Sequence, residues 1–386
     1  MRIKLKDVFE LQIGKTPSRN KREYWNGVYK WVSISDIGNS GKYLYSTREL
    51  ITDKAIIDSG IKVIPKGTVI MSFKLSIGKT AITTEDMYTN EAIVAFIDKK
   101  KIPIDIDYLY YLCSGSNWMQ GVNKAVMGLT LNKATLLEKE INIPNIKIQK
   151  KCAGNLDKID RIIDLKKQQL DQLDLLTRSL FIEMFGNLGE DIFGDGLKLL
   201  KDVCQINPKK DNYIANIKDF LVSFVPMSAV SESGEIDTTI IKCYDEVKKG
   251  FTSFIEDDVL FAKITPCMEN GKGAIAKKLK NSVGFGSTEF HVLRPLKDKS
   301  NSAWIYYLTS FSHFRKEAEI KMTGSAGQRR VPASFLENYK IALPPLELQH
   351  KFEKSAIVID KSKLAVKKSL EELEILKKSL MQKYFA

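Results

Sequence analysis

The stretch INIPNIKIQKKCAGNLDKIDRIIDLKKQQLDQLDLLTRSLFIEMF, residues 141–185, occurs twice in this chain. The second copy, IALPPLELQHKFEKSAIVIDKSKLAVKKSLEELEILKKSLMQKYF, begins 200 residues later and ends at Phe385. Without gaps, thirteen positions are identical, and they include Gln149 and Gln349. A repeat of this length divides a chain into similar halves, so it is the first guide to the domain organisation.

Both copies place apolar residues at heptad spacing after a proline that suits the first turn of a helix. About 38 helical residues would form a rod of roughly 57 Å, whose narrow apolar stripe needs a partner. The sequence predicts that the two helices pair antiparallel as a coiled coil; alternatively, each packs on its own domain. Lys166 falls within the stripe, where its stem can pack while its ammonium reaches water. The residues predicted to pack are Ile159, Leu170, Leu173, Ile359, Val366, Leu370, Leu373 and Leu380.

The segments between the repeats mix β-branched runs with glycine and proline turns, which predicts α/β domains. Their features recur in the same order: DYLYYL (107–112) resembles AWIYYL (303–308), and TNEAIVAFI (89–97) resembles STEFHVLRP (287–295). A helix is expected over 105–122. The predicted fold is therefore α+β, with two α/β domains separated by a long antiparallel two-helix coiled coil. The expected segments are 1–145, 146–186, 187–345 and 346–386.

The composition is that of a globular protein, with 44% hydrophobic and 28% charged residues. A net charge of +13 and a pI near 9.2 suggest a polyanionic partner, although a basic surface can also serve solubility alone. No apolar run approaches the ~20 residues that span a membrane. The five cysteines are widely spaced and form no CxxC pair, so we expect a reduced, cytoplasmic protein without a zinc site.

Sequence motifs for catalysis are absent. The chain contains no GxSxG, HExxH, Walker A or Rossmann GxGxxG pattern. Asn207-Pro208-Lys209 lacks the second proline and the aromatic residue of an adenine-methyltransferase motif. We therefore expect no intrinsic catalysis, no bound cofactor and no metal.

Basic loops that carry aromatic and amide side chains are plentiful in both halves. In KTPSRNKREYWNG (15–27), arginine can donate two hydrogen bonds to guanine, and asparagine can pair with adenine. The alternative is that each loop is merely solvated. The candidate DNA-binding residues are Lys15, Arg19, Lys21, Arg22, Asn39, Lys42, Tyr43, Lys74, Lys79, Lys209, Lys210, Ser231, Lys263, Asn270, Lys272, Arg329 and Arg330.

Over its whole length, the chain resembles the specificity subunit of a type I restriction–modification system. The pattern GSAGQRRVPASFLENYKIALPPLELQ (324–349), followed by a helix ending in KKSLMQKYF, carries the resemblance most specifically. The first-half counterpart, GLTLNKATLLEKEINIPNIKIQ (128–149), has Asn145 in place of the second proline.

The resemblance implies that each α/β domain is a target-recognition domain for one half of a bipartite DNA sequence. The helices would set the spacing of the halves and dock the modification (methyltransferase) subunit, in two copies. That subunit would supply S-adenosylmethionine and the adenine chemistry, and an ATP-driven restriction subunit would complete the assembly. Two other functions remain open: a coiled-coil structural or interaction protein without sequence-specific DNA binding, and a self-contained methyltransferase.

Overall fold

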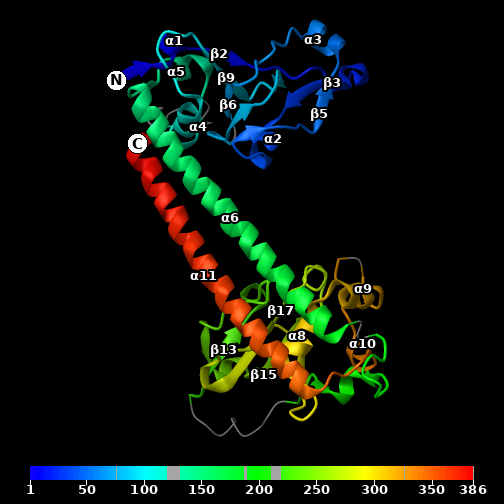
Figure 1. Cartoon of the computed structure of the whole chain (residues 1–386). Helices are drawn as coiled ribbons and strands as arrows, with labels where there is room; N and C mark the ends of the chain where they lie inside the picture. Colours follow the sequence, from blue (N-terminus) through cyan, green and yellow to red (C-terminus); the bar gives the residue numbers. More distant parts are fainter. Residues whose placement is uncertain (75, 120–130, 187–188, 210–218, 326, 386) are drawn as a thin grey trace. The chain divides into compact units, whose positions relative to one another are not determined.

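The computed structural model describes residues 1–74, 76–119, 131–186, 189–209, 219–325 and 327–385. The chain forms two compact units. Unit 1 comprises residues 1–167 and 368–386, and unit 2 comprises residues 168–367. Figure 1 shows two long helices, α6 (Ile146–Phe185) in green and α11 (Leu346–Phe385) in red. Each of them has one part in unit 1 and the other part in unit 2.

The sheet of unit 1 has five strands in the order β2-β9-β6-β7-β4, beside a three-stranded sheet, β5-β3-β8, and the pair β1-β10. Strands β6 and β7 are buried at every residue, and helix α4 packs on both. The bounds are β1 Arg2–Lys4, β2 Phe9–Ile13, β3 Trp25–Val32, β4 Tyr43–Leu44, β5 Glu49–Ile51, β6 Val69–Ser72, β7 Thr80–Thr83, β8 Tyr88–Thr89, β9 Ile93–Asp98, β10 Glu140–Asn142, α1 Leu5–Val8, α2 Ile34–Asn39, α3 Asp53–Ser59, α4 Ile106–Gly115, α5 Lys133–Leu137 and the 3-10 turn η1 Arg22–Tyr24.

Unit 2 repeats this plan with the sheets β12-β19-β16-β17 and β14-β13-β18-β15 and the pair β11-β20. One strand pair is parallel in the three-stranded sheet of unit 1, β3 with β8, and one in the sheet β14-β13-β18-β15 of unit 2, β13 with β18. The bounds are β11 Lys198–Leu199, β12 Cys204–Ile206, β13 Leu221–Val225, β14 Ile241–Cys243, β15 Thr252–Ile255, β16 Val259–Ala262, β17 Gly273–Ile275, β18 Val283–Gly286, β19 Phe290–Pro295, β20 Lys340–Ile341, α7 Tyr244–Val247, α8 Ser302–Ser310, α9 Ser312–Ile320, α10 Ala333–Glu337 and the 3-10 turns η2 Leu200–Asp202, η4 Met227–Ala229 and η5 Lys280–Ser282.

The helix that the sequence predicts over residues 105–122 is shorter in the structure, where α4 spans Ile106–Gly115. Helix α4 ends at Gly115, and the indole of Trp118 folds back to donate to the Cys113 carbonyl at 2.7 Å. A β-carbon on Gly115 would lie 2.5 Å from the terminal methyl of Met381, so the glycine lets α11 approach. Met381 of α11 thus packs at the end of α4, while residues 120–122 lie outside the described residues.

A buried glutamine joins the start of each long helix to its domain. The Gln149 side chain accepts from the Asp105 N–H at 2.8 Å and donates to the carbonyls of Pro103 and Pro144 at 3.1 and 2.8 Å. Gln349 repeats all three bonds, with the Asn301 N–H and the carbonyls of Lys299 and Pro344. Both side chains therefore tie the helix start to the loop that precedes α4 or α8.

The departure at Asn145 has a local explanation. Its side-chain oxygen accepts from the Ile148 N–H at 3.0 Å, so it satisfies one of the backbone donors that the first turn of a helix leaves unpaired. The backbone carbonyls of both residues accept a helical hydrogen bond, Asn145 from the Gln149 N–H at 3.0 Å and Pro345 from the Gln349 N–H at 3.2 Å. Both residues therefore start a helix, and Asn145 adds a side-chain acceptor to the first turn.

The long helices pack against each other, antiparallel, in a coiled-coil manner in both units. In unit 1 the Lys377 ammonium lies 2.5 Å from the Asp160 carboxylate, and in unit 2 the Lys363 ammonium lies 2.7 Å from Asp174. Asp174 follows Asp160 by 14 residues on α6, and Lys363 precedes Lys377 by 14 residues on α11. The register is therefore the same in the two units.

The predicted seam residues follow one stripe along these helices. Ile159, Ile359 and Val366 are buried. Lys166 is half-buried, as expected for a lysine whose stem packs in the stripe. The remaining predicted residues are also half-buried: Leu170, Leu173, Leu370, Leu373 and Leu380.

The ends of the long helices also complete the domain cores. The alternative interpretation, in which each long helix packs on a domain, therefore holds for the helix ends. In unit 1, Phe385 lies against Tyr108, with ring centroids 5.3 Å apart. In unit 2, the rings of Phe181 and Phe185 lie 5.2 and 5.4 Å from that of Phe352. Within the described residues, no helix combines the length and the apolar composition needed to cross a bilayer.

Candidate nucleic-acid interface

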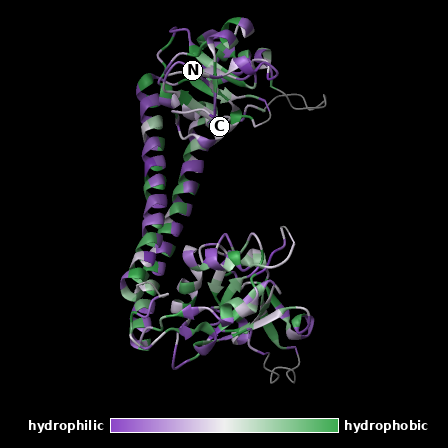
Figure 2. Ribbon diagram, turned by 90° about the vertical axis from the view of Figure 1, so that its right-hand side faces the viewer, coloured by the Kyte–Doolittle hydropathy of each residue, from purple (hydrophilic) through white to green (hydrophobic). Residues whose placement is uncertain are grey.

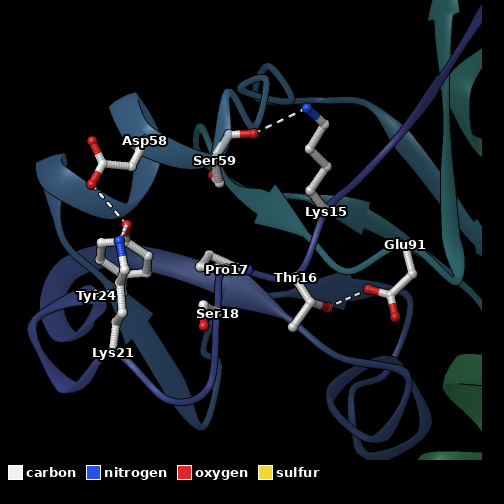
Figure 3. Close-up of a pocket in the computed structure, with 9 residues that line it drawn as sticks. All are labelled: Lys15, Thr16, Pro17, Ser18, Lys21, Tyr24, Asp58, Ser59 and Glu91. Atoms are coloured by element: carbon white, nitrogen blue, oxygen red, sulfur yellow. Dashed lines mark hydrogen bonds between the residues drawn. The ribbon is translucent and has the colours of Figure 1, made fainter.

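The first basic loop, residues 15–27, follows strand β2, and Gly14 joins the strand to the loop. A β-carbon on Gly14 would lie 1.9 Å from the carbonyl oxygen of Thr89, so only glycine lets the loop cross the end of β8 here. The loop then lines an open pocket of about 520 Å³. Its lining residues, shown in Figure 3, are Lys15, Thr16, Pro17, Ser18, Lys21, Tyr24, Asp58, Ser59 and Glu91.

Lysines on this loop are held by neutral oxygen atoms. The Lys15 ammonium donates to the Ser59 carbonyl at 3.0 Å, and the Lys21 ammonium donates to the Tyr24 hydroxyl at 2.7 Å (Figure 3). That hydroxyl in turn donates to the Asp58 carboxylate at 2.7 Å. Both ammonium groups remain at the surface, where they can contact phosphate.

Arg19 is held in a stacked position. Its guanidinium lies 3.9 Å from the centre of the Trp25 ring and forms an ion pair with Glu49. Trp25 meets Trp31 edge to face, with ring centroids 5.2 Å apart. Arg22 lies next to this group and is exposed. The structure thus brings four of the candidate residues, Lys15, Arg19, Lys21 and Arg22, to one loop.

Lys42 and Tyr43 have partners inside unit 1. The Lys42 ammonium lies 2.8 Å from Asp107 and 2.5 Å from Asp157 on α6, and only 16% of its side chain is exposed. Burial acts to lower its pKa, but hydrogen bonds to these two carboxylates outweigh it and raise the pKa. Tyr43 donates to Asp107 at 3.1 Å. Lys42 therefore connects the domain to α6 and contributes little positive charge to a DNA-facing surface, whereas Tyr43 binds α4.

Three further candidates of unit 1 divide between two places. Asn39 is exposed at the end of α2, and the adjacent Gly38 lies close to Lys79, since a β-carbon there would be 2.7 Å from the Lys79 ammonium. Lys74 lies near the first loop instead, where its charge contributes to lowering the pKa of Glu91. Lys74 therefore adds a positive charge near the loop that carries Lys15, Arg19 and Lys21. Lys79 instead lies beside the end of α2, close to Asn39.

Two loops of unit 2 are joined by backbone hydrogen bonds. The Thr265 N–H donates to the Arg329 carbonyl at 3.0 Å, and the Val331 N–H donates to the Lys263 carbonyl at 2.9 Å. This pairing brings together five candidates from loops about 60 residues apart in the sequence. They are Lys263, Asn270, Lys272, Arg329 and Arg330.

Carboxylates accompany both arginines of this group. Arg330 binds Glu289 through three hydrogen bonds of 2.7–3.1 Å, which is the main cause of the lowered pKa of Glu289. The Arg329 guanidinium lies 3.7 Å from Glu269 and 3.6 Å from Glu319. The two arginines are therefore partly neutralised, whereas Lys263 forms no ion pair with any residue in the described ranges.

The remaining candidates of unit 2 lie on other loops. Lys209 is exposed at the end of the loop after β12, and Lys210 lies outside the described residues. Ser231 builds a turn, because its hydroxyl oxygen accepts from the N–H groups of Glu235 and Ser233 at 2.9 and 3.2 Å. Ser231 thus has a local structural role, and Lys209 is the exposed cation of this set.

Two charged residues near these loops escaped the sequence analysis. Glu91 lies among the basic residues of the first loop, but a search for basic clusters passes over acidic side chains. Arg315 on α9 donates to the Glu269 carbonyl at 3.2 Å, and burial lowers its pKa. Its helix carries no basic run, so only the fold brings it to the loop of Asn270. No group of three metal-ligating side chains occurs within the described residues.

Sequence comparison supports a single family over both units. The sequence model for the type I restriction modification DNA specificity domain matches residues 1–175 and again 197–374. The type I restriction enzyme EcoEI specificity subunit of Escherichia coli is 45% identical over 148 residues, which are 38% of this chain and 24% of that subunit. The chain thus spans about a quarter of this relative's length. The MjaIX specificity subunit of Methanocaldococcus jannaschii is 26% identical over 381 residues, 90% of this chain and 84% of that subunit.

Solved structures share the fold. A structure described under the complex assembly and conformational transition of the type I R-M system has a TM-score of 0.62 at 16% identity, covering 100% of this chain and 97% of that one. The S subunit of the type I restriction–modification system from M. genitalium has a TM-score of 0.55 at 14% identity, covering 100% and 96%. With two matched domains, each followed by a long helix, this chain belongs to the type I restriction modification DNA specificity family.

Proposed function

We propose that this chain is the non-catalytic DNA-specificity subunit of a type I restriction–modification enzyme. Each α/β domain would bind one half of a bipartite DNA target, in the cytoplasm. The observation that carries the proposal is the twofold match of the family over two domains whose loops collect cations, with Arg19 stacked on Trp25 in the first. Such side chains suit phosphate contact and base reading. Coexpression with a cognate methyltransferase and mapping of methylated adenines tests it.

The long helices would set the spacing between the two half-sites. Support comes from their equal lengths of 40 residues and from the ion pairs that hold one register in both units. Adding seven residues after Gln168 and seven after Lys368 keeps the heptad phase and lengthens each helix by roughly 10 Å. The gap between methylated half-sites should then grow by about three base pairs of ~3.4 Å each. An unchanged gap would contradict this role.

The helices would also dock two copies of the modification subunit, with a restriction subunit completing the enzyme. Large aliphatic side chains are exposed at the same repeat position in both units: Leu176 is 51% and Leu376 is 48% exposed. Their neighbours, Leu175 and Ile375, are 64% and 69% exposed. Figure 2 shows such hydrophobic residues interspersed with hydrophilic ones along both helices. An exposed apolar position that occurs once in each unit suits a partner that binds twice.

Leu176→Glu should remove one copy of the methyltransferase, and Leu376→Glu the other, because each buries an unpaired charge in one interface. Native mass spectrometry of the purified complex would count the copies, and the double variant should retain none. Leu364→Glu is the matched control, since Leu364 is 68% exposed but its counterpart in the first copy is Asp164. Retention of both copies by the double variant would contradict docking at these positions.

A further inference from the structure

Glu91 occupies an exposed position among the cations of the first loop. It follows β8, and its carboxylate accepts a hydrogen bond from the Thr16 hydroxyl (Figure 3). Lys15 and Lys21 line the same pocket. The Thr16 bond is the main cause of the lowered pKa of Glu91, and the charges of Lys74 and Arg19 lower it further. Thr16 therefore holds this carboxylate beside the lysines of the pocket, whose second acid, Asp58, accepts from the Tyr24 hydroxyl.

This carboxylate keeps acceptor capacity that the acids paired with arginine have lost. Glu49 is taken up by Arg19 and Glu289 by Arg330. Glu91, by contrast, forms no ion pair with any residue in the described part of the chain; Thr16 is its side-chain partner. An ionised carboxylate has room for about four hydrogen bonds, so one or more positions remain for a donor from outside.

A carboxylate on a surface that meets DNA is repelled by the phosphates, and this cost must be offset by a donor on the DNA. The donors that DNA presents in the major groove are the exocyclic amino groups of cytosine and adenine, and acidic side chains accept from cytosine N4. We propose that Glu91 is a specificity-determining residue of the first domain, which accepts a hydrogen bond from the exocyclic amino group of one base. This assignment rests on the proposed function.

The second domain lacks this carboxylate at the equivalent position. Aligned letter by letter, TNEAIVAFI and STEFHVLRP would make Glu289 the counterpart of Glu91. The strand register corrects this by one residue, because the Phe73 N–H donates to the Ala92 carbonyl and the Lys263 N–H to that of Glu289. Glu289 thus corresponds to Ala92, and Thr288 corresponds to Glu91. The two domains therefore present different chemistry at this point, as reading two different half-sites requires.

The test uses the complex of the full chain with its methyltransferase and the target sequence obtained by methylation mapping. Competition binding would compare duplexes in which one adenine is replaced by purine, or one cytosine by 2-pyrimidinone, so that only the amino group is lost. For the wild type, one position in the half-site of the first domain should weaken binding roughly 10-fold, within the range of a single base contact. With Glu91→Ala that penalty should largely disappear, since no acceptor for the amino group remains; glutamine would keep one, because its amide oxygen also accepts. The sensitive base, adenine or cytosine, identifies the amino group.

Glu10→Ala is the matched control, because Glu10 is exposed on β2 and does not line the pocket, and its substitution removes the same charge. Its penalties should equal those of the wild type. If Glu91→Ala binds DNA more tightly at every sequence but keeps all base penalties, Glu91 acts only through charge and the assignment is overturned, while the proposed function stands. If the wild-type complex shows no sequence preference, the proposed function fails and the assignment with it.

Discussion

Phe352→Ala should destabilise unit 2 by about 3–5 kcal/mol, the usual cost of emptying a large aromatic site in a core. Phe352 is fully buried at the start of α11. Its ring meets those of Phe181, Phe185 and Tyr307 at centroid distances of 5.2, 5.4 and 5.1 Å. Because Phe181 and Phe185 belong to α6, the cavity would loosen both the helix pair and its attachment to the domain.

Amide hydrogen exchange, followed separately for peptides of each unit, would measure this loss, since a two-unit chain need not unfold in one step. Leu364→Ala on the same helix is the control, because Leu364 is 68% exposed and should cost little. Faster exchange is expected in the domain of unit 2 and little change in that of unit 1. A loss below about 1 kcal/mol would show that the aromatic cluster does not hold α11 in place.

Gln149→Met should cost unit 1 about 3 kcal/mol, because three hydrogen bonds disappear together and buried backbone groups lose their partners. The side chain is 1% exposed, so water does not readily replace it. Gln349→Met should have a similar effect on unit 2, where the side chain is fully buried and forms the same three bonds. Methionine matches glutamine in length, so the change isolates the hydrogen bonds from the packing.

Gln382→Met provides the matched control, since Gln382 is exposed on α11. Denaturation monitored by hydrogen exchange should show a loss confined to the unit that carries the buried substitution. Equal stability of Gln149→Met and Gln382→Met would contradict the proposed role of the glutamine in fixing the helix start.

The helical part of the fold could be predicted from the sequence because it depends on short-range periodicity. Heptad spacing located the seam, and the repeat located its partner. The observed helices, 146–185 and 346–385, begin where the expected segments 146–186 and 346–386 begin. The boundaries of the four segments otherwise stay a prediction, since the compact units cut through both helices.

The candidate DNA-binding residues were harder to predict from the sequence, because the partners of charged side chains are set by tertiary contacts. Lys42 looked like a DNA-binding lysine, yet its partner Asp157 lies 115 residues away in the sequence. Arg330 and Glu289, 41 residues apart, present the same difficulty. Composition indicates how many cations a loop carries, but only the fold shows which of them retain charge to offer. Glu91 is an acidic residue that the search for basic loops passed over. Its proposed acceptor role depends on tertiary neighbours that no local sequence pattern reveals.

The most direct test of the central claim is to map methylated adenines in DNA from cells that express the chain with its methyltransferase. We expect a bipartite site with two different half-sequences at a fixed distance. Exchanging residues 1–140 for the corresponding domain of another specificity subunit should change one half-sequence and leave the other intact. Methylation without a defined sequence, or a change in both halves, would contradict independent reading by two domains.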